Sequence, residues 1–134
     1  MTPEKLTEIL YLAENLKKNT RHSWLSNGRR ESVAEHSWRL SLFAYFVKDE
    51  FPNVDMDKVI MMCIFHDLGE AFTGDIPSFY KTNNDEEIEK HKLSEWVNTL
   101  PQPYKDELNA LYTEMEELNT EEAKLWKAMD KLEA

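Results

Sequence analysis

The sequence predicts an all-α protein, a single helical bundle with about six helices. Only three glycines and five prolines occur in 134 residues, and most lie between segments whose apolar residues recur at helical spacing. No segment shows sustained alternation of apolar and polar residues, so we expect no β-strands. The length and a hydrophobic content of 41% favour one domain over residues 1–134, with a substantial core.

The first two expected helices have clear start signals. Thr2 and Pro3 are typical of an N-cap and a first helical position, and an apolar stripe follows as far as Leu16. Residues 18–31 break this pattern, so we expect a long polar loop there. The string Ser32-Val33-Ala34-Glu35 is a capping box that opens the second helix, which is expected to end before Pro52.

The third helix is expected to be the most buried one. Its sequence is apolar on nearly all sides from Val59 to Leu68, which is typical of a helix at the centre of a bundle, and Asp55 or Asp57 can cap it. We expect a loop from Gly69 to about residue 77. Three further helices should follow, over about residues 85–99, about residues 104–118, and from Thr120 onward.

Composition excludes several classes of protein. Sixteen Lys and Arg stand against 26 Asp and Glu, and the net charge of −10 argues against nucleic acid or an anionic membrane as the main partner. The longest apolar run, residues 59–65, is far shorter than a membrane span requires. Cys63 is the only cysteine, and no secretory signal is visible, so we expect a reducing, cytoplasmic location. All four arginines fall between Arg21 and Arg39, which leaves one basic stretch for a small anionic ligand.

Ionisable residues in apolar surroundings mark the candidate site. An isolated His-Asp dipeptide such as His66-Asp67 is more often a buried hydrogen-bonded pair than a functional site. Here, however, further ionisable residues occur at core-facing positions. His36 lies on the apolar face of the second helix, and Asp130 lies on or near the buried face of the last one. A shared cation is the simplest way to neutralise these groups, and a mixed His/Asp set favours a divalent transition metal such as Mn, Fe, Co, Ni or Zn. Glu70 would share the side of His66 if the third helix continues that far.

The order His36, then His66-Asp67, then Asp130 resembles the signature of the HD-domain superfamily of metal-dependent phosphohydrolases. Two strings are more specific, Glu35-His36-Ser37 and residues 66–77, which read HDLGEAFTGDIP. They resemble the 5′-deoxynucleotidase branch, which hydrolyses deoxynucleoside 5′-monophosphates. The resemblance covers roughly residues 5–134.

The resemblance implies a role for each matching residue. Glu70 and Asp75 would handle the attacking water and the leaving group, and Arg21 would hold the phosphate. Lys81 stands where relatives often have a basic residue. In that branch a tryptophan follows the arginine directly; here Trp24 is the tryptophan nearby and would supply an aromatic wall for the sugar or base. The implied ligands of one divalent metal ion are His36, His66, Asp67 and Asp130.

These expectations favour a nucleotidase that acts on a small-molecule nucleotide. The alternatives are an HD phosphohydrolase for a cyclic dinucleotide, a nucleoside triphosphate or an alarmone, and a non-catalytic HD module that binds a nucleotide or metal. Similar family members continue through at least one more helix, so we expect this chain to be short at its C-terminal end. That helix would cover the pocket or join the interface of a homodimer.

Overall fold

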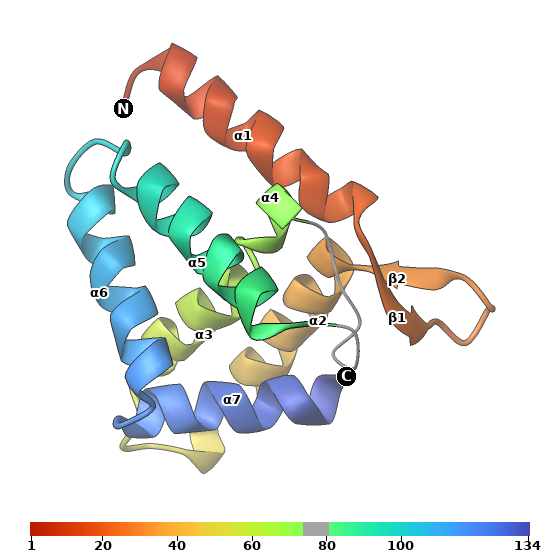
Figure 1. The fold of residues 1–134 in the computed structure, drawn as a ribbon. Coiled ribbons are helices and arrows are strands. Elements are labelled where there is room, and N and C mark those ends of the chain that lie inside the picture. Colours follow the sequence, from red (N-terminus) through yellow and green to blue (C-terminus); the bar gives the residue numbers. More distant parts are fainter. Residues whose placement is uncertain (74–80) are drawn as a thin grey trace.

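The structure, a computed structural model, describes residues 1–73 and 81–134. Within these residues six helices of ten residues or more form a bundle, and two short helices complete it (Figure 1). The all-α prediction is therefore confirmed. The long helices are α1 (Pro3–Lys18), α2 (Val33–Phe46), α3 (Met56–Phe65), α5 (Asn83–Val97), α6 (Tyr104–Glu117) and α7 (Glu121–Glu133); the short ones are the 3-10 helix η1 (Lys48–Glu50) and α4 (Glu70–Thr73).

The start of α2 is fixed by the predicted capping box. The Glu35 backbone N–H donates to Ser32 Oγ over 3.1 Å, and the Ser32 backbone N–H donates to Glu35 Oε1 over 2.8 Å. These two bonds satisfy donors that a helix start leaves without partners. They set the first turn of α2, which carries His36.

A β-hairpin replaces the predicted polar loop over residues 18–31. Strand β1 (Thr20–Trp24) pairs in antiparallel fashion with β2 (Arg30–Ser32), so the expectation of no strands was wrong. In β1 the residues alternate between exposed and half-buried, but the inward ones are polar, Arg21 and Ser23. A strand whose inner face is polar has no alternating hydrophobic pattern to read. Gly28, with φ of 85°, supplies the left-handed backbone that the turn requires.

The core lies where α7 packs against α2 and α3. Leu40, Val59 and Met62 are fully buried there. We expected α3 to be buried on nearly all sides, but its Met61 and Ile64 side chains are exposed. Within the described residues no helix is both long enough and apolar enough to cross a bilayer.

The third helix ends at Phe65, three residues earlier than predicted. The Phe65 carbonyl accepts from the Leu68 backbone N–H at 3.2 Å and from the Tyr112 hydroxyl of α6 at 2.8 Å. The chain then turns into α4, so Glu70 does not share a helix with His66.

The last turn of α1 holds α4 in place. The Asn19 side-chain amide donates to the Glu70 carbonyl at 2.9 Å, and the Asn15 amide donates to the Ala71 carbonyl at 3.2 Å. α4 takes up part of the predicted loop over residues 69–77, and the remainder of that loop lies outside the described residues.

Candidate metal centre

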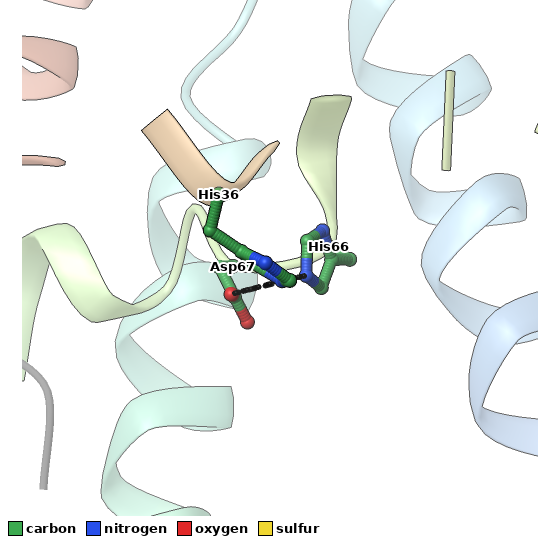
Figure 2. Close-up of side chains that lie close together, drawn as sticks. All are labelled: His36, His66 and Asp67. Atoms are coloured by element: carbon green, nitrogen blue, oxygen red, sulfur yellow. Dashed lines mark hydrogen bonds and ion pairs between the residues drawn. The ribbon is translucent and has the colours of Figure 1, made fainter. Parts of the chain in front are cut away.

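The four predicted metal ligands meet where α2, α3 and α7 converge. His36 comes from the first turn of α2, His66 and Asp67 directly follow α3, and Asp130 lies in α7. In Figure 2 the His36 and His66 rings and the Asp67 carboxylate point toward one another. His36 is fully buried, and the side chains of the other three are 3–23% exposed. The bundle thus brings together residues that are far apart in the sequence.

The ligand atoms lie at distances that suit one shared ion. His36 Nε2 lies 3.2 Å from His66 Nε2 and 2.8 Å from Asp130 Oδ1. His66 Nε2 lies 3.0 Å from Asp67 Oδ2 and 3.1 Å from Asp130 Oδ1. Neighbouring ligands about 2.1 Å from a common ion, at right angles to one another, are about 3 Å apart. Two imidazoles and two carboxylates at this spacing fit a divalent transition metal.

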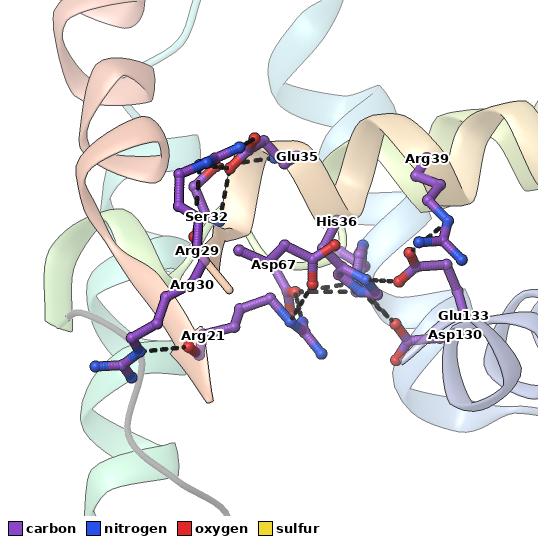
Figure 3. A network of polar contacts seen from close by, with 12 residues as sticks. Arg21, Arg29, Arg30, Ser32, Glu35, His36, Arg39, Asp67, Asp130 and Glu133 are labelled. Carbon is purple, nitrogen blue, oxygen red and sulfur yellow. Dashed lines mark hydrogen bonds and ion pairs between the residues drawn. The ribbon is translucent and has the colours of Figure 1, made fainter. Parts of the chain in front are cut away.

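Each histidine ring is oriented by a contact at its Nδ1 atom. His66 Nδ1 lies 2.8 Å from the Cys63 carbonyl. A carbonyl can only accept, so Nδ1 carries the hydrogen and Nε2 is left to face the other ligands. His36 Nδ1 contacts Glu133 Oε2, and its Nε2 likewise faces the other ligands (Figure 3).

Cys63 itself does not join the ligand set. Its side chain is fully buried, and burial raises the pKa of the thiol to about 12. A thiol with that pKa stays neutral at physiological pH and is a poor metal ligand.

The two carboxylates of the cluster require a compensating positive charge. Burial lowers the pKa of His66, but the Asp67 and Asp130 carboxylates outweigh that effect and raise it to about 10. Burial would raise the pKa of Asp67 and of Asp130, yet the neighbouring histidines hold both below the usual range. In the absence of a metal ion, a proton on His66 therefore supplies the compensating charge.

Arg21, the residue expected to hold the phosphate, lies beside the cluster. Its Nη1 is 3.5 Å from Asp67 Oδ2, and its Nε is 3.4 Å from Oε2 of buried Glu31. Burial, and secondly the charge of Glu133, raise the pKa of Glu31. The hairpin thus carries a half-buried guanidinium to the edge of the metal centre.

Of the two predicted catalytic acids, Glu70 is described and Asp75 is not. Glu70 is buried at the start of α4, and its backbone N–H donates to the Asp67 carbonyl at 3.0 Å. Asp75 lies outside the described residues. Lys81 Nζ is 3.4 Å from Glu89 Oε2; burial lowers the pKa of Lys81, but Glu89 and then Glu70 outweigh it and raise the pKa.

Trp24 does not join this group. It lies three residues after Arg21 in β1, on the opposite face of the strand, and it is 69% exposed. Its ring is 5.8 Å from the Arg30 guanidinium carbon instead. The structure therefore brings Arg21 to the metal centre and leaves Trp24 on the outer face of the hairpin.

Sequence reasoning missed two buried carboxylates, Glu31 and Glu133. Glu133 follows Asp130 by three positions, a spacing that places both on one side of a helix, and this was the available signal. Glu31 directly precedes the capping box and has no comparable signal.

Comparison with known proteins agrees with this geometry. The HD domain family matches residues 13–134. The chain is 31% identical to a protein of Dictyostelium discoideum named 5′-deoxynucleotidase HDDC2, over 94% of this chain and 72% of that protein. It is 30% identical to the human protein of the same name, over 96% of this chain and 64% of that protein. The chain thus spans roughly two thirds of these relatives, and less than two thirds of the human one.

Solved structures share the fold. A predicted metal-dependent phosphohydrolase from Magnetospirillum magnetotacticum superposes with a TM-score of 0.82 at 28% identity, covering 96% of this chain and 65% of that one. A conserved hypothetical protein from Pyrococcus furiosus gives a TM-score of 0.77 at 32% identity, covering 95% and 76% of the two chains.

The raised pKa of His66 predicts that metal binding depends on pH. The folded-state pKa of about 10 is above the ordinary histidine value of about 6.5, so the metal-free protein keeps this proton at pH 7 and loses its stabilising effect as pH rises toward 10. A metal ion must displace the proton, so the Kd for Zn²⁺ should fall by up to about tenfold per pH unit between pH 7 and 9. Calorimetry in buffers of different ionisation enthalpy measures both the Kd and the released proton.

The control for this experiment is His91→Asn. His91 is exposed on α5, so its replacement should leave the pH dependence unchanged. A Kd that does not vary with pH, with no proton released, would contradict the prediction.

Proposed function

The chain belongs to the HD domain family, and from this premise we propose that it is a metal-dependent phosphohydrolase. Its proposed substrates are deoxynucleoside and nucleoside 5′-monophosphates. The observation that carries the proposal is the meeting of four metal-ligating side chains with a guanidinium beside them, Arg21 against Asp67. The relatives named 5′-deoxynucleotidase support the substrate class.

The proposed cofactor is one divalent transition metal ion, Mn, Co, Fe, Ni or Zn. His36, His66, Asp67 and Asp130 would hold it, and their mutual spacing supports this assignment. Such an ion, when bound, lowers the pKa of a coordinated water and offsets charge on the phosphoryl oxygens.

Two acids are proposed to move protons. Glu70 is buried one turn after Asp67, so its carboxylate is suited to take a proton from the attacking water. Asp75 is proposed to protonate the departing 5′ oxygen of the nucleoside, and the two roles could be exchanged. The reaction then needs no covalent intermediate, because water itself attacks phosphorus.

Cationic side chains are proposed to hold the phosphate. The planar Arg21 fork can donate to two phosphate oxygens, and its position beside Asp67 supports this role. Lys81 is proposed as a second cation, because it lies near enough to Glu70 for that carboxylate to raise its pKa.

A groove beside the metal centre is proposed to receive the nucleoside. It has a volume of about 500 Å³ and lies between α5, α6 and α7. Its lining includes His66 itself, together with Tyr112, Trp126 and Lys127. Aromatic walls with a few polar groups suit a base and sugar, and the volume is ordinary for a small-molecule site.

We further propose that residues 1–134 form a single HD domain that pairs as a homodimer in the cytoplasm. A groove of about 680 Å³ lies between α1, α2 and α3 and is lined by Leu10, Trp38 and Ile64 among others. Apolar surface of this kind often forms a protein–protein interface, which supports pairing there. The solitary, buried Cys63 supports a reducing compartment.

Analytical ultracentrifugation should show a dimer at micromolar concentration, and Trp38→Glu should shift it to monomer. A wild-type monomer under these conditions would contradict the pairing.

The central test measures phosphate release from nucleoside and deoxynucleoside 5′-monophosphates with Mn²⁺, Co²⁺ or Mg²⁺, or with EDTA. Turnover should require a metal. Glu70→Gln should lower kcat by about 10²–10⁴-fold, because it removes the base, and should leave the Kd for Zn²⁺ nearly unchanged. Glu87→Gln, on the exposed side of α5, is the matched control and should keep the wild-type rate.

Three results would change the assignment. Full activity in Glu70→Gln would remove its catalytic role. Hydrolysis of a cyclic dinucleotide or a triphosphate, but of no monophosphate, would favour another phosphohydrolase. Metal binding with no turnover of any nucleotide would favour a binding module.

Substitutions of Arg21 and Trp24 should have different effects on kcat/KM in the same assay. Arg21→Ala should lower kcat/KM for a 5′-monophosphate by about 10–100-fold, the loss expected for a charge-assisted hydrogen bond to phosphate. Trp24→Ala should stay within about threefold of the wild type, because a 69% exposed side chain retains few contacts to lose. Equal losses in the two variants would mean that Trp24 reaches the substrate after all.

A further inference from the structure

Glu133 is a buried carboxylate placed directly behind a metal ligand. Its side chain is only 2% exposed, although it lies in the last turn of α7. Oε2 contacts His36 Nδ1, the imidazole nitrogen that points away from the other ligands. Figure 3 shows Glu133 and Asp130 reaching His36 from the same helix.

We propose that Glu133 is a positioning residue that fixes the tautomer and ring orientation of His36. A carboxylate accepts a hydrogen bond, so its contact places a hydrogen on Nδ1. The Nε2 lone pair then serves a metal ion that Asp130 shares. Nε2 indeed faces Asp130 Oδ1 at 2.8 Å and His66 Nε2 at 3.2 Å. Carboxylate–histidine–metal arrangements of this kind strengthen the ligand and hold its ring in place. The inference rests on the metal centre of the proposed function.

Arg39 completes the arrangement from the surface. Its Nε lies 3.3 Å from Glu133 Oε1, while its own side chain is 65% exposed. A buried carboxylate needs a compensating positive charge, and an arginine at the surface supplies one without itself being desolvated. Glu133 is therefore held from two sides, with one oxygen directed to His36 and the other toward Arg39.

A second metal ion is the competing explanation for this cluster. Glu31, His36 and Glu133 each offer a ligand atom, and these atoms lie within 4.8 Å of one another. Both carboxylates, however, already face a guanidinium: Glu31 that of Arg21, and Glu133 that of Arg39. An ion would also need the Nδ1 lone pair of His36, so His36 would have to bridge two metals. These contacts favour positioning over a second ion.

The test uses the full chain with Zn²⁺ as the probe. Titration calorimetry gives the Kd and the stoichiometry, and ¹⁵N-histidine NMR of the Zn²⁺-loaded protein reports which nitrogen of His36 bears hydrogen. The wild type should bind one Zn²⁺ and show a protected Nδ1–H on His36. Glu133→Ala should weaken Zn²⁺ binding by about 10–100-fold and expose that hydrogen to exchange. Glu133→Gln keeps an accepting oxygen, so its loss should be smaller.

Glu121→Ala is the control, since Glu121 lies exposed in the first turn of the same helix. Wild-type Zn²⁺ affinity in Glu133→Ala, with an unchanged His36 spectrum, would overturn the proposal. Two Zn²⁺ per wild-type chain, one of them lost in Glu133→Ala, would overturn it in favour of a second ion. If Glu133→Ala does not fold, Glu133→Leu, which also lacks an accepting oxygen, decides by the same criteria. Because none of these readouts is turnover, failure of the proposed hydrolysis would be seen separately.

Discussion

The arrangement of this protein depends on one electrostatic constraint: Asp67 and Asp130 must be held together in the interior with charge to balance them. Burial of carboxylates is unfavourable unless a cation or protonated group lies within contact distance. A proton on His66 can supply that balance, and so can an ion shared by His36 and His66. α2, α3 and α7 pack so that all four side chains converge, and the surrounding core keeps them there.

The same constraint repeats outside the ligand set. Glu31 and Glu133 are also buried, and each faces an arginine that approaches from the surface. Arg21 is supplied by the β-hairpin and Arg39 by α2, so two arginines of the basic stretch seen in the sequence offset the charge of buried carboxylates.

Much of the fold could be predicted, and so could the residues of the candidate centre, because the signals were local. The capping box at Ser32 fixes a helix start through two adjacent bonds, and His66 stood out as polar within an apolar run. The misses came from contacts made across the fold. At the end of α3, the Phe65 carbonyl accepts a hydrogen bond from Tyr112 of α6. In strand β1 the inward side chains are polar, Arg21 among them, so no apolar alternation marks the strand. Glu133 reaches His36 only because α7 packs against α2, a contact that the sequence of α7 alone does not reveal.

The reach of α7 also has a consequence for biosynthesis. Asp130 follows His36 by 94 residues, which take roughly 5–20 s to synthesise at typical elongation rates. Throughout that interval the growing chain has His36, joined by His66 after 30 residues, but neither Asp130 nor Glu133 to meet them. The four residues therefore cannot meet before Asp130 has been synthesised. A metal ion held by all four side chains would accordingly bind after α1, α2 and α3 have been synthesised, and would not be the nucleus around which these helices first form.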